Sequence, residues 1–487
     1  MSMHASSTPF RPRRVAVAGA TGFVGSALQD ALLERGHEVL ALTRRDMAAN
    51  ATLPMRQWRQ ANLFHLREVE RALEGADEAI YLVHSMLPSA RLSQGTFADL
   101  DLICADNFAR AARAAGVARI TYVGGLLPEG ERCSAHLQSR WEVERALGEH
   151  GVPLVALRAG IVFGAGGSSS NMLLRLVERL PVMVLPKWCQ SECQPTSLGD
   201  LVRVLCAVVA SPVEGSASWD VGNEEILRYS DMLERAAKAL GVRRWYVPVP
   251  AFTPSLSLWW VSWVTGTPMA LVAPLVGSLL HDLRVRPEHD AKRAFAGPWQ
   301  SFEQSLASAL EARPARGKSA RTPSARRARG VVSVQRLLRP AHMTAEGVAR
   351  HYVHWLTHDL WWLSPFVRVV ASEPMPGGGE QGARRIDFCL RGFGPLLLRL
   401  DFAPARSSPE RQLFYISGGA LTRPTDAAHP GRFEFRSVLG RRYVMAAIYD
   451  FVPRLPWALY KVTQALVHAL VMAGFRRHLA RLGRAPR

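Results

Sequence analysis

The chain has few cysteines, and their arrangement argues against a disulfide-bonded secreted protein and against a zinc-binding protein. No paired CxxC cluster and no secretory disulfide framework is present, so a reducing cytoplasmic setting is expected. Cys189 and Cys193 lie four residues apart, but no second pair or histidine cluster completes a zinc set, and no metal site is predicted. The six cysteines are Cys104, Cys133, Cys189, Cys193, Cys206 and Cys389.

A long apolar leader is also missing, and acidic residues are absent from one internal stretch. The N-terminal MSMHASSTPFRPRR lacks the apolar core of a signal peptide, which again favours the cytoplasm. The net charge is +19, and residues 313–487 hold 29 Lys/Arg against 10 Asp/Glu, whereas the first 312 residues balance. Residues 313–330 contain seven basic residues and no acid, so we predict a flexible linker over 313–340. Contact with anionic lipid is an alternative, and specific nucleic-acid binding is not expected.

Uninterrupted apolar runs of membrane-spanning length are scarce. Residues 247–281 carry no charged side chain before His281. By its length alone, this segment could span a bilayer. Prolines at 250, 254, 268 and 274 divide this segment, however, so two short helices roofing an apolar pocket fit better than one spanning helix.

The most informative stretch that is present reads VAVAGATGFVG, residues 15–25. An apolar strand runs into three glycines, and a helical segment follows at once. Gly19 would make the tight turn, Gly22 would leave room for phosphates, and Gly25 would let helix and strand pack closely. Backbone N–H groups and the helix dipole at such a turn bind a pyrophosphate, so a dinucleotide site is predicted here.

The end of the second predicted strand indicates which dinucleotide is preferred. That strand, residues 37–43, ends at Arg44 and Arg45, where a site selective for NAD places a carboxylate on the ribose 2′-OH. An arginine suits a 2′-phosphate, so Arg44 predicts NADP, with NAD less favoured. A solvated loop arginine is the alternative.

Strands and helices alternate before the basic segment. This pattern predicts an α/β fold with a Rossmann-type doubly wound parallel sheet, whose ligands bind beyond the carboxyl ends of the strands. The predicted strands are residues 15–19, 39–43, 78–84, 119–125 and 153–160.

At this point the chain resembles an extended or atypical short-chain dehydrogenase/reductase. The matching motifs are GATGFVG, YLVHS, ITYVGG, LRAGIVFG and QPTSLGDL. NFARAARAAGVARITYVGGL and RLPVMVLP are similar to a bacterial subgroup of NmrA-like and epimerase-like NAD(P)-binding proteins that often carry an extra C-terminal domain. The resemblance covers about residues 13–310 and implies an NAD(P)-binding domain over 13–312. It places a small substrate subdomain at about 164–195 and 225–310.

The resemblance also implies the cofactor contacts. Thr21, Phe23 and Val24, with the glycines of the turn, would lie on the pyrophosphate. Asn62 and Leu63 would lie beside the adenine. Val83, His84 and Ser85 would line the nicotinamide side.

One departure from the family concerns the chemistry. Members that transfer a hydride usually carry Tyr-x-x-x-Lys on the helix after the fifth strand, and here that register reads His136 to Arg140. Residues four apart share a helix face, and an imidazole acts as acid or base near neutral pH, so His136 and Arg140 are the catalytic candidates. The serine with which the family usually polarises the substrate carbonyl is replaced around Gly124, and Ser134 is a candidate substitute. The alternative is that both are ordinary helix residues, because a fold supplies no chemistry by itself.

The last predicted domain, residues 341–487, mixes helical and strand-like stretches and ends in a long apolar helix with a basic end. The pattern predicts an α+β module with an antiparallel sheet packed on that helix, enclosing an apolar ligand; contact of the helix with a membrane surface is the alternative. The whole chain is thus expected to be an NADP-dependent oxidoreductase acting on an apolar small molecule. The competing hypothesis is a non-catalytic NAD(P)H-binding sensor or assembly factor.

Overall fold

The computed structural model divides the chain into two compact units. The first unit comprises Met1–Leu87 and Cys104–Pro323, and the second comprises Pro88–Ile103 and Ser324–Arg487. The structure describes residues 11–45, 54–84, 90–130, 133–249, 254–266, 269–311, 328–359, 366–372, 385–392, 394–423 and 430–483.

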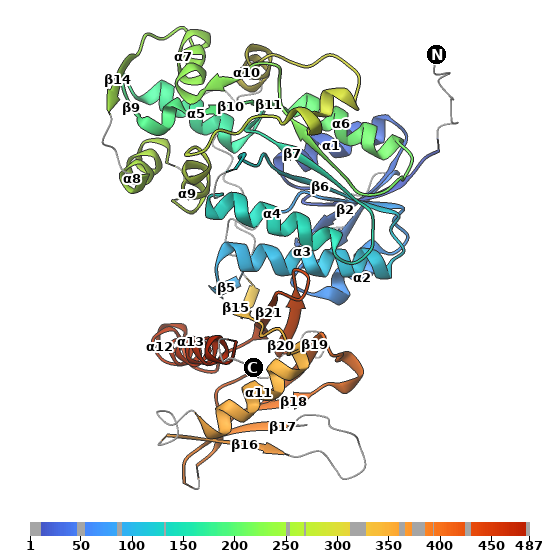
Figure 1. Cartoon of the computed structure of the whole chain (residues 1–487), viewed down its shortest axis with the longest axis vertical. Coiled ribbons are helices and arrows are strands. Elements are labelled where there is room, and N and C mark those ends of the chain that lie inside the picture. Colours follow the sequence, from blue (N-terminus) through green and yellow to red (C-terminus); the bar gives the residue numbers. More distant parts are fainter. Residues whose placement is uncertain are drawn as a thin grey trace. The chain divides into compact units, whose positions relative to one another are not determined.

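The first unit is built on a seven-stranded sheet in which every neighbouring pair is parallel (Figure 1). The strand order is β12-β7-β6-β4-β1-β2-β3, so the order reverses between β1 and β4. This confirms the predicted doubly wound sheet and adds β3 and β12, which the sequence pattern had not shown. The strands are β1 (Arg14–Ala18), β2 (Glu38–Thr43), β3 (Arg56–Gln60), β4 (Glu78–Tyr81), β6 (Arg119–Gly125), β7 (Leu154–Ala159) and β12 (Ala217–Val221).

Helices cover both faces of this sheet. Leu28 and Leu32 of α1 (Phe23–Glu34) share a buried core with Val15 and with α6 (Leu198–Ala210). On the opposite face, Phe108 of α3 (Phe97–Ala114) meets Tyr81 edge-on, with ring centroids 5.0 Å apart. The two remaining helices that flank the sheet are α2 (Leu66–Leu73) and α4 (Ala135–Gly148).

The rest of the first unit consists of short elements around a second core that includes Leu174, Met232 and Phe302. Three two-stranded sheets pair β8 with β11, β10 with β13 and β9 with β14. Two short helices, α8 and α9, occupy the apolar segment where the sequence predicts them. The elements are β8 (Val162–Phe163), α5 (Ser168–Arg179), β9 (Val182–Pro186), η2 (Lys187–Gln190), β10 (Glu192–Cys193), β11 (Thr196–Ser197), β13 (Leu227–Arg228), α7 (Tyr229–Ala239), β14 (Trp245–Val249), α8 (Pro254–Thr265), α9 (Met269–Ser278), η3 (Pro287–His289), η4 (Ala291–Arg293) and α10 (Phe302–Glu311).

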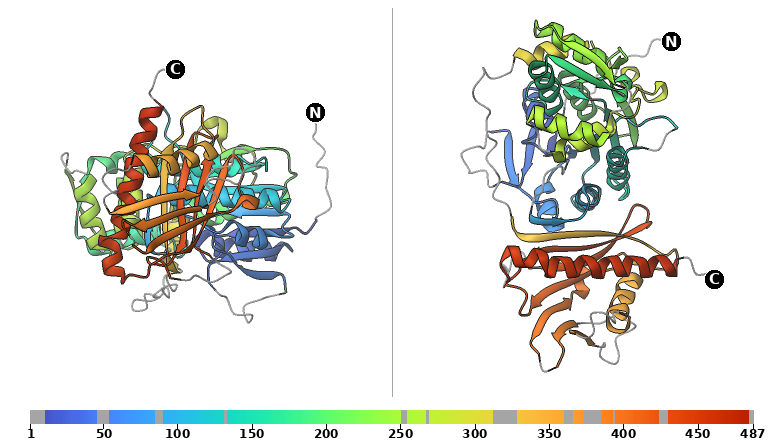
Figure 2. Two further views of the ribbon diagram at one scale, coloured as in Figure 1. Left: turned by 90° about the horizontal axis from the view of Figure 1, so that it is seen from below. Right: turned by 90° about the vertical axis from the view of Figure 1, so that its left-hand side faces the viewer.

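The second unit has an eight-stranded sheet in the order β16-β17-β18-β19-β20-β21-β15-β5, with a long helix lying along it (Figure 2). Its pairs are antiparallel except β15 with β5, which is parallel. Buried Trp355 of α11 and Phe475 of α13 join the sheet residues in one core. The elements are β5 (Ala90–Gln94), β15 (Ala328–Leu338), α11 (Ala345–His358), β16 (Val367–Ser372), β17 (Arg385–Leu390), β18 (Leu396–Phe402), η5 (Pro404–Arg406), β19 (Arg411–Gly418), β20 (Arg432–Val438), β21 (Tyr443–Phe451), α12 (Trp457–Val462) and α13 (Gln464–Leu482).

The structure corrects three boundaries. The predicted linker at 313–340 is too long, because β15 occupies Ala328–Leu338 and pairs with β21. The predicted strand 78–84 ends at Tyr81. The second unit does not begin at 341, since it also includes β5, a strand from the first hundred residues.

Among the described residues, one helical stretch, Trp457–Leu482, is long and apolar enough to cross a membrane by length and composition. A single such stretch is weak evidence, because core helices of soluble proteins share these properties. Thr463 interrupts the stretch, and Met472, Phe475 and Leu479 are buried in the core of the second unit.

Candidate functional site

The first loop of the chain forms a tight turn directly after β1. Gly19 has φ +88°, and the Gly22 N–H donates to the Gly19 carbonyl at 2.9 Å. A Cβ atom on Gly19 would lie 3.1 Å from the Leu82 carbonyl carbon, so the backbones after β1 and β4 approach closely. Both the dihedral angle and this approach require glycine.

Helix α1 starts from this turn without a side chain capping its N-terminal end. Gly22 is the N-cap and supplies no side-chain cap, and the first turn of α1 has no acidic residue. A Cβ on Gly25 would lie 2.3 Å from the Gly19 oxygen, so only glycine lets the helix pack this tightly against the turn. Thr21 and Gly22 are exposed. The arrangement presents N–H groups and a positive dipole end to an anion.

The turn lies where the strand order reverses, because β1 pairs with β2 on one side and β4 on the other. Ligands of open parallel sheets bind in the crevice at that point. Arg44 follows the neighbouring strand β2 and is exposed. The Arg45 N–H donates to Thr43 Oγ1 at 3.2 Å, which fixes the start of the loop.

The predicted adenine pair, Asn62 and Leu63, lies in the loop after β3. The Asn62 N–H donates to Glu68 at 2.9 Å, and Asn62 Oδ1 accepts from the Phe64 N–H at 3.2 Å. The Leu63 carbonyl accepts from Asn107 Nδ2 at 2.8 Å. These bonds hold the loop in place.

The structure brings two histidines together near the end of β4. Val83 and His84 are half-buried just after that strand, and the imidazole rings of His84 and His136 have centroids 5.1 Å apart. His136 is half-buried in the first turn of α4. Ser85, the remaining predicted nicotinamide contact, lies outside the described residues.

The other polar candidates around α4 have different surroundings. Ser134 is the N-cap of α4, and its oxygen accepts from the Leu137 N–H at 3.3 Å. Arg140 is one turn beyond His136 and only 7% exposed, and its carbonyl accepts from the Tyr122 hydroxyl at 3.2 Å. His136 is therefore the more accessible of the two catalytic candidates.

Arg158, which belongs to the motif LRAGIVFG and lies near the end of β7, is a core residue. It is buried, and its guanidinium donates to both carboxylate oxygens of Glu144 at 2.6 and 3.0 Å. Asp220 lies 3.7 Å from the same group.

Sequence reasoning missed a contact that closes the loop after β8 over the start of α1. Cβ atoms on Gly164 and Gly167 would lie 3.3 and 3.0 Å from Phe23 Cζ, so both glycines make room for that ring. The Gly164 N–H donates to Ser170 Oγ at 3.2 Å. Gly164 ends the motif LRAGIVFG and was a visible signal, but its contact Phe23 is more than 100 residues away in the sequence.

Within the described part of the chain, no cluster of three or more His, Cys, Asp or Glu side chains has metal-binding geometry. Cys189 and Cys193 are buried, and burial raises the pKa of each thiol to about 12.

Residues 15–217 match the model of the NAD dependent epimerase/dehydratase family. This segment, which is less than half of the chain, is similar to the members of that family. It contains the glycine turn, His84 and His136, and it ends at the first residue of β12, the edge strand of the seven-stranded sheet.

Individual relatives are distant. Auxiliary protein GraX of Staphylococcus aureus is 30% identical over 141 residues, which are 29% of this chain and 42% of GraX, so the chain spans less than half of that relative. Ceramide reductase of Caulobacter vibrioides is 28% identical over 245 residues, 48% of this chain and 73% of the relative. The solved triphenylmethane reductase of Citrobacter sp. has a TM-score of 0.50 at 16% identity, covering 61% of this chain and 99% of that one, which shows the shared fold.

Proposed function

We propose that the first unit is an NADP-dependent oxidoreductase of the atypical short-chain dehydrogenase/reductase type, acting on an apolar small molecule. The observation that carries the proposal is the glycine turn opening α1 at the point where the strand order reverses. Such a turn binds the diphosphate of a dinucleotide through backbone N–H groups.

The preference for NADP rests on Arg44. Its exposed guanidinium follows β2, the strand next to the turn, where an arginine suits the 2′-phosphate that distinguishes NADP from NAD. A guanidinium matches a phosphate through two parallel N–H donors.

The bound dinucleotide would supply hydride chemistry at its nicotinamide C4. The chain's own contribution is a proton at the substrate oxygen, and His136 is the proposed donor and acceptor. An imidazole exchanges a proton near neutral pH, and His136 lies beside His84 at the strand-end edge of the sheet. Arg140 supports the same helix turn from a buried position.

An apolar substrate is supported by the segment after β14. Trp259 and Trp263 of α8 stack with centroids 6.4 Å apart, and Trp263 is 75% exposed. Val261 of the same helix packs with Val272 and Val276 of α9 in a small apolar cluster. The similarity to a protein named ceramide reductase points in the same direction.

Replacing His136 tests the proposal. In His136→Ala we expect NADPH affinity, measured by nucleotide fluorescence, to stay within about twofold, because His136 belongs to α4 and not to the turn proposed to bind the diphosphate. Turnover of apolar ketones and aldehydes, measured as NADPH consumption, should fall by about 10²- to 10⁴-fold, the usual contribution of a general acid.

The matched control is His342→Ala, which removes an exposed histidine of the second unit and should leave turnover unchanged. If the wild-type chain binds NADPH but consumes it with no member of the panel, the oxidoreductase proposal fails. The non-catalytic sensor or assembly factor then becomes the better explanation.

We also propose that the second unit contacts anionic membrane surfaces peripherally. Several apolar side chains of α12 and α13 are exposed, and Lys461, Arg476 and Arg477 on the same helices are exposed as well. Apolar side chains that enter the headgroup region beside basic ones are typical of helices lying on a membrane. The exposed apolar residues are Leu459, Val462, Leu466, Val467 and Leu470.

A further inference from the structure

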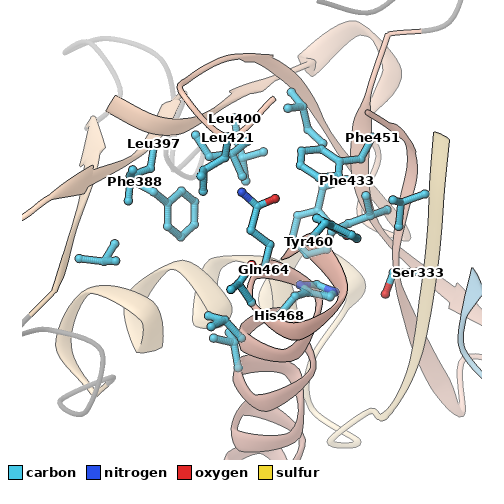
Figure 3. Close-up of a pocket in the computed structure, with 18 of the residues that line it drawn as sticks. Ser333, Phe388, Leu397, Leu400, Leu421, Phe433, Phe451, Tyr460, Gln464 and His468 are labelled. Atoms are coloured by element: carbon cyan, nitrogen blue, oxygen red, sulfur yellow. The ribbon is translucent and has the colours of Figure 1, made fainter. Parts of the chain in front are cut away.

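The second unit contains a cavity of about 330 Å³, between its sheet and helices α11 to α13 (Figure 3). Phe388, Leu400 and Phe433 line it from the sheet, and Leu356 and Val471 line it from the helices. This volume lies within the range of small-molecule sites, which are concave and mostly apolar.

The described residues that line the cavity carry no charged side chain under neutral conditions. They include no Asp, Glu, Lys or Arg, and their titratable groups are two tyrosines and one histidine. Burial raises the pKa of Tyr460 to about 12, and burial lowers the pKa of His468 to about 4. An ionised ligand would therefore lose its hydration without gaining a counter-charge.

Gln464 places an unpaired polar group in this cavity. Its Nε2 and Oε1 are both buried and make no hydrogen bond to the described residues, and Figure 3 shows the side chain extending from α13 toward Leu421 and Leu400. Ser333 Oγ, also in the lining, is likewise buried without a hydrogen bond to that part of the chain. Buried amides in native proteins are nearly always hydrogen-bonded, so an unpaired one facing a cavity indicates a missing partner.

We propose that this cavity binds an uncharged, mostly apolar small molecule with one carbonyl or hydroxyl oxygen, which hydrogen-bonds the carboxamide of Gln464. A carboxamide both donates and accepts, so it suits either oxygen. The cavity reaches the surface beside α13, because Val467 lines it and is 38% exposed. The site is separate from the dinucleotide turn and does not rest on the proposed oxidoreductase activity.

Displacement of Nile red, an uncharged apolar dye, from the full chain tests the proposal. The competitors are 2-octanone, 1-octanol, octane and octanoate, which share chain length and differ in the head group. We expect the ketone and the alcohol to bind about five- to tenfold more tightly than octane, the value of one hydrogen bond. Octanoate should bind more weakly than either.

Three variants locate the site. Gln464→Leu should bind octane as the wild type does but lose the preference for ketone and alcohol, and without ligand its Tm should rise by about 2–4 °C, because an unpaired buried amide is removed. Leu466→Gln, at an exposed position of the same helix, is the control and should change neither property. Leu400→Trp should fill the cavity and abolish displaceable dye binding.

The proposal is overturned if the dye is not displaced by any competitor, or if Gln464→Leu keeps the preference for the polar head groups. It is also overturned if octanoate binds best. Should Leu400→Trp not fold, the Gln464→Leu stability and selectivity measurements still decide the matter.

Discussion

Arg44 shows at the scale of one residue how the choice of dinucleotide can be tested. Arg44→Glu places a carboxylate where a 2′-phosphate is proposed to bind, so NADPH affinity should fall by about 10- to 100-fold, the value of a charge-assisted hydrogen bond. NADH affinity should hold or improve, because a carboxylate accepts the ribose 2′-OH. Fluorescence titration with both nucleotides measures this.

The control is Arg35→Glu, an exposed arginine at the other end of α1 whose Nη1 donates to the Ala31 carbonyl. It makes the same charge change away from the turn. If NADPH and NADH bind equally well and neither affinity changes in Arg44→Glu, the assignment of Arg44 to the 2′-phosphate is wrong.

Residues whose role is local could be predicted from the sequence. Gly22 and Gly25 act through contacts with Gly19 and Ala20 in the same turn, so the spacing of the three glycines carries the information, whereas the approach of Gly19 to Leu82 comes from the fold. Arg158 could not be assigned, because its role depends on Glu144 from another element. The burial of Arg140 is equally a matter of what packs around α4.

Strand β5 shows what is decided at the scale of elements. It follows β4 in sequence but pairs with β15, more than 200 residues later, to complete the sheet of the second unit. Gln94 Nε2 donates to the Ala465 carbonyl at 3.0 Å, and Arg336 Nε donates to Asp99 at 2.7 Å. Its five residues lie between the predicted strands 78–84 and 119–125, and nothing local identifies their partner.

Gly95, directly after β5, provides the test of this pairing. Its φ is +147°, and a Cβ would lie 2.7 Å from the Val334 carbonyl oxygen. Gly95→Ala should lower the free energy of unfolding of the second unit by about 2 kcal/mol, through backbone strain and this clash. Urea unfolding followed by circular dichroism measures the change.

Gly392→Ala is the matched control. Gly392 also has a positive φ, +88°, but a Cβ atom added there would meet no described atom within 4 Å beyond its chain neighbours. Only backbone strain of about 1 kcal/mol is therefore expected. Equal losses in the two variants would mean that the approach of β15 to Gly95 is not as described.

At the scale of the whole molecule, charge and apolar surface are unevenly distributed. Residues 313–487 carry the entire excess of positive charge, and the exposed apolar residues of α12 and α13 belong to the same part of the chain. We expect the chain to sediment with phosphatidylcholine vesicles that contain phosphatidylglycerol at low salt, and to be released at high salt.

Pure phosphatidylcholine vesicles are the lipid control. The double variant Val462→Gln, Leu470→Gln should weaken binding by about tenfold, because two apolar side chains no longer enter the interface. If the wild-type chain stays in the supernatant with the anionic vesicles at low salt, the membrane proposal is wrong.

The sequence by itself determined the doubly wound parallel sheet, the glycine turn and the mixed C-terminal unit, because each depends on short-range periodicity or on glycine spacing. Only the tertiary structure decided the partner of β5, the core position of Arg158 and the cavity around Gln464. Those features come from residues far apart in the chain, whose contacts are set by packing and by the satisfaction of buried polar groups rather than by local pattern.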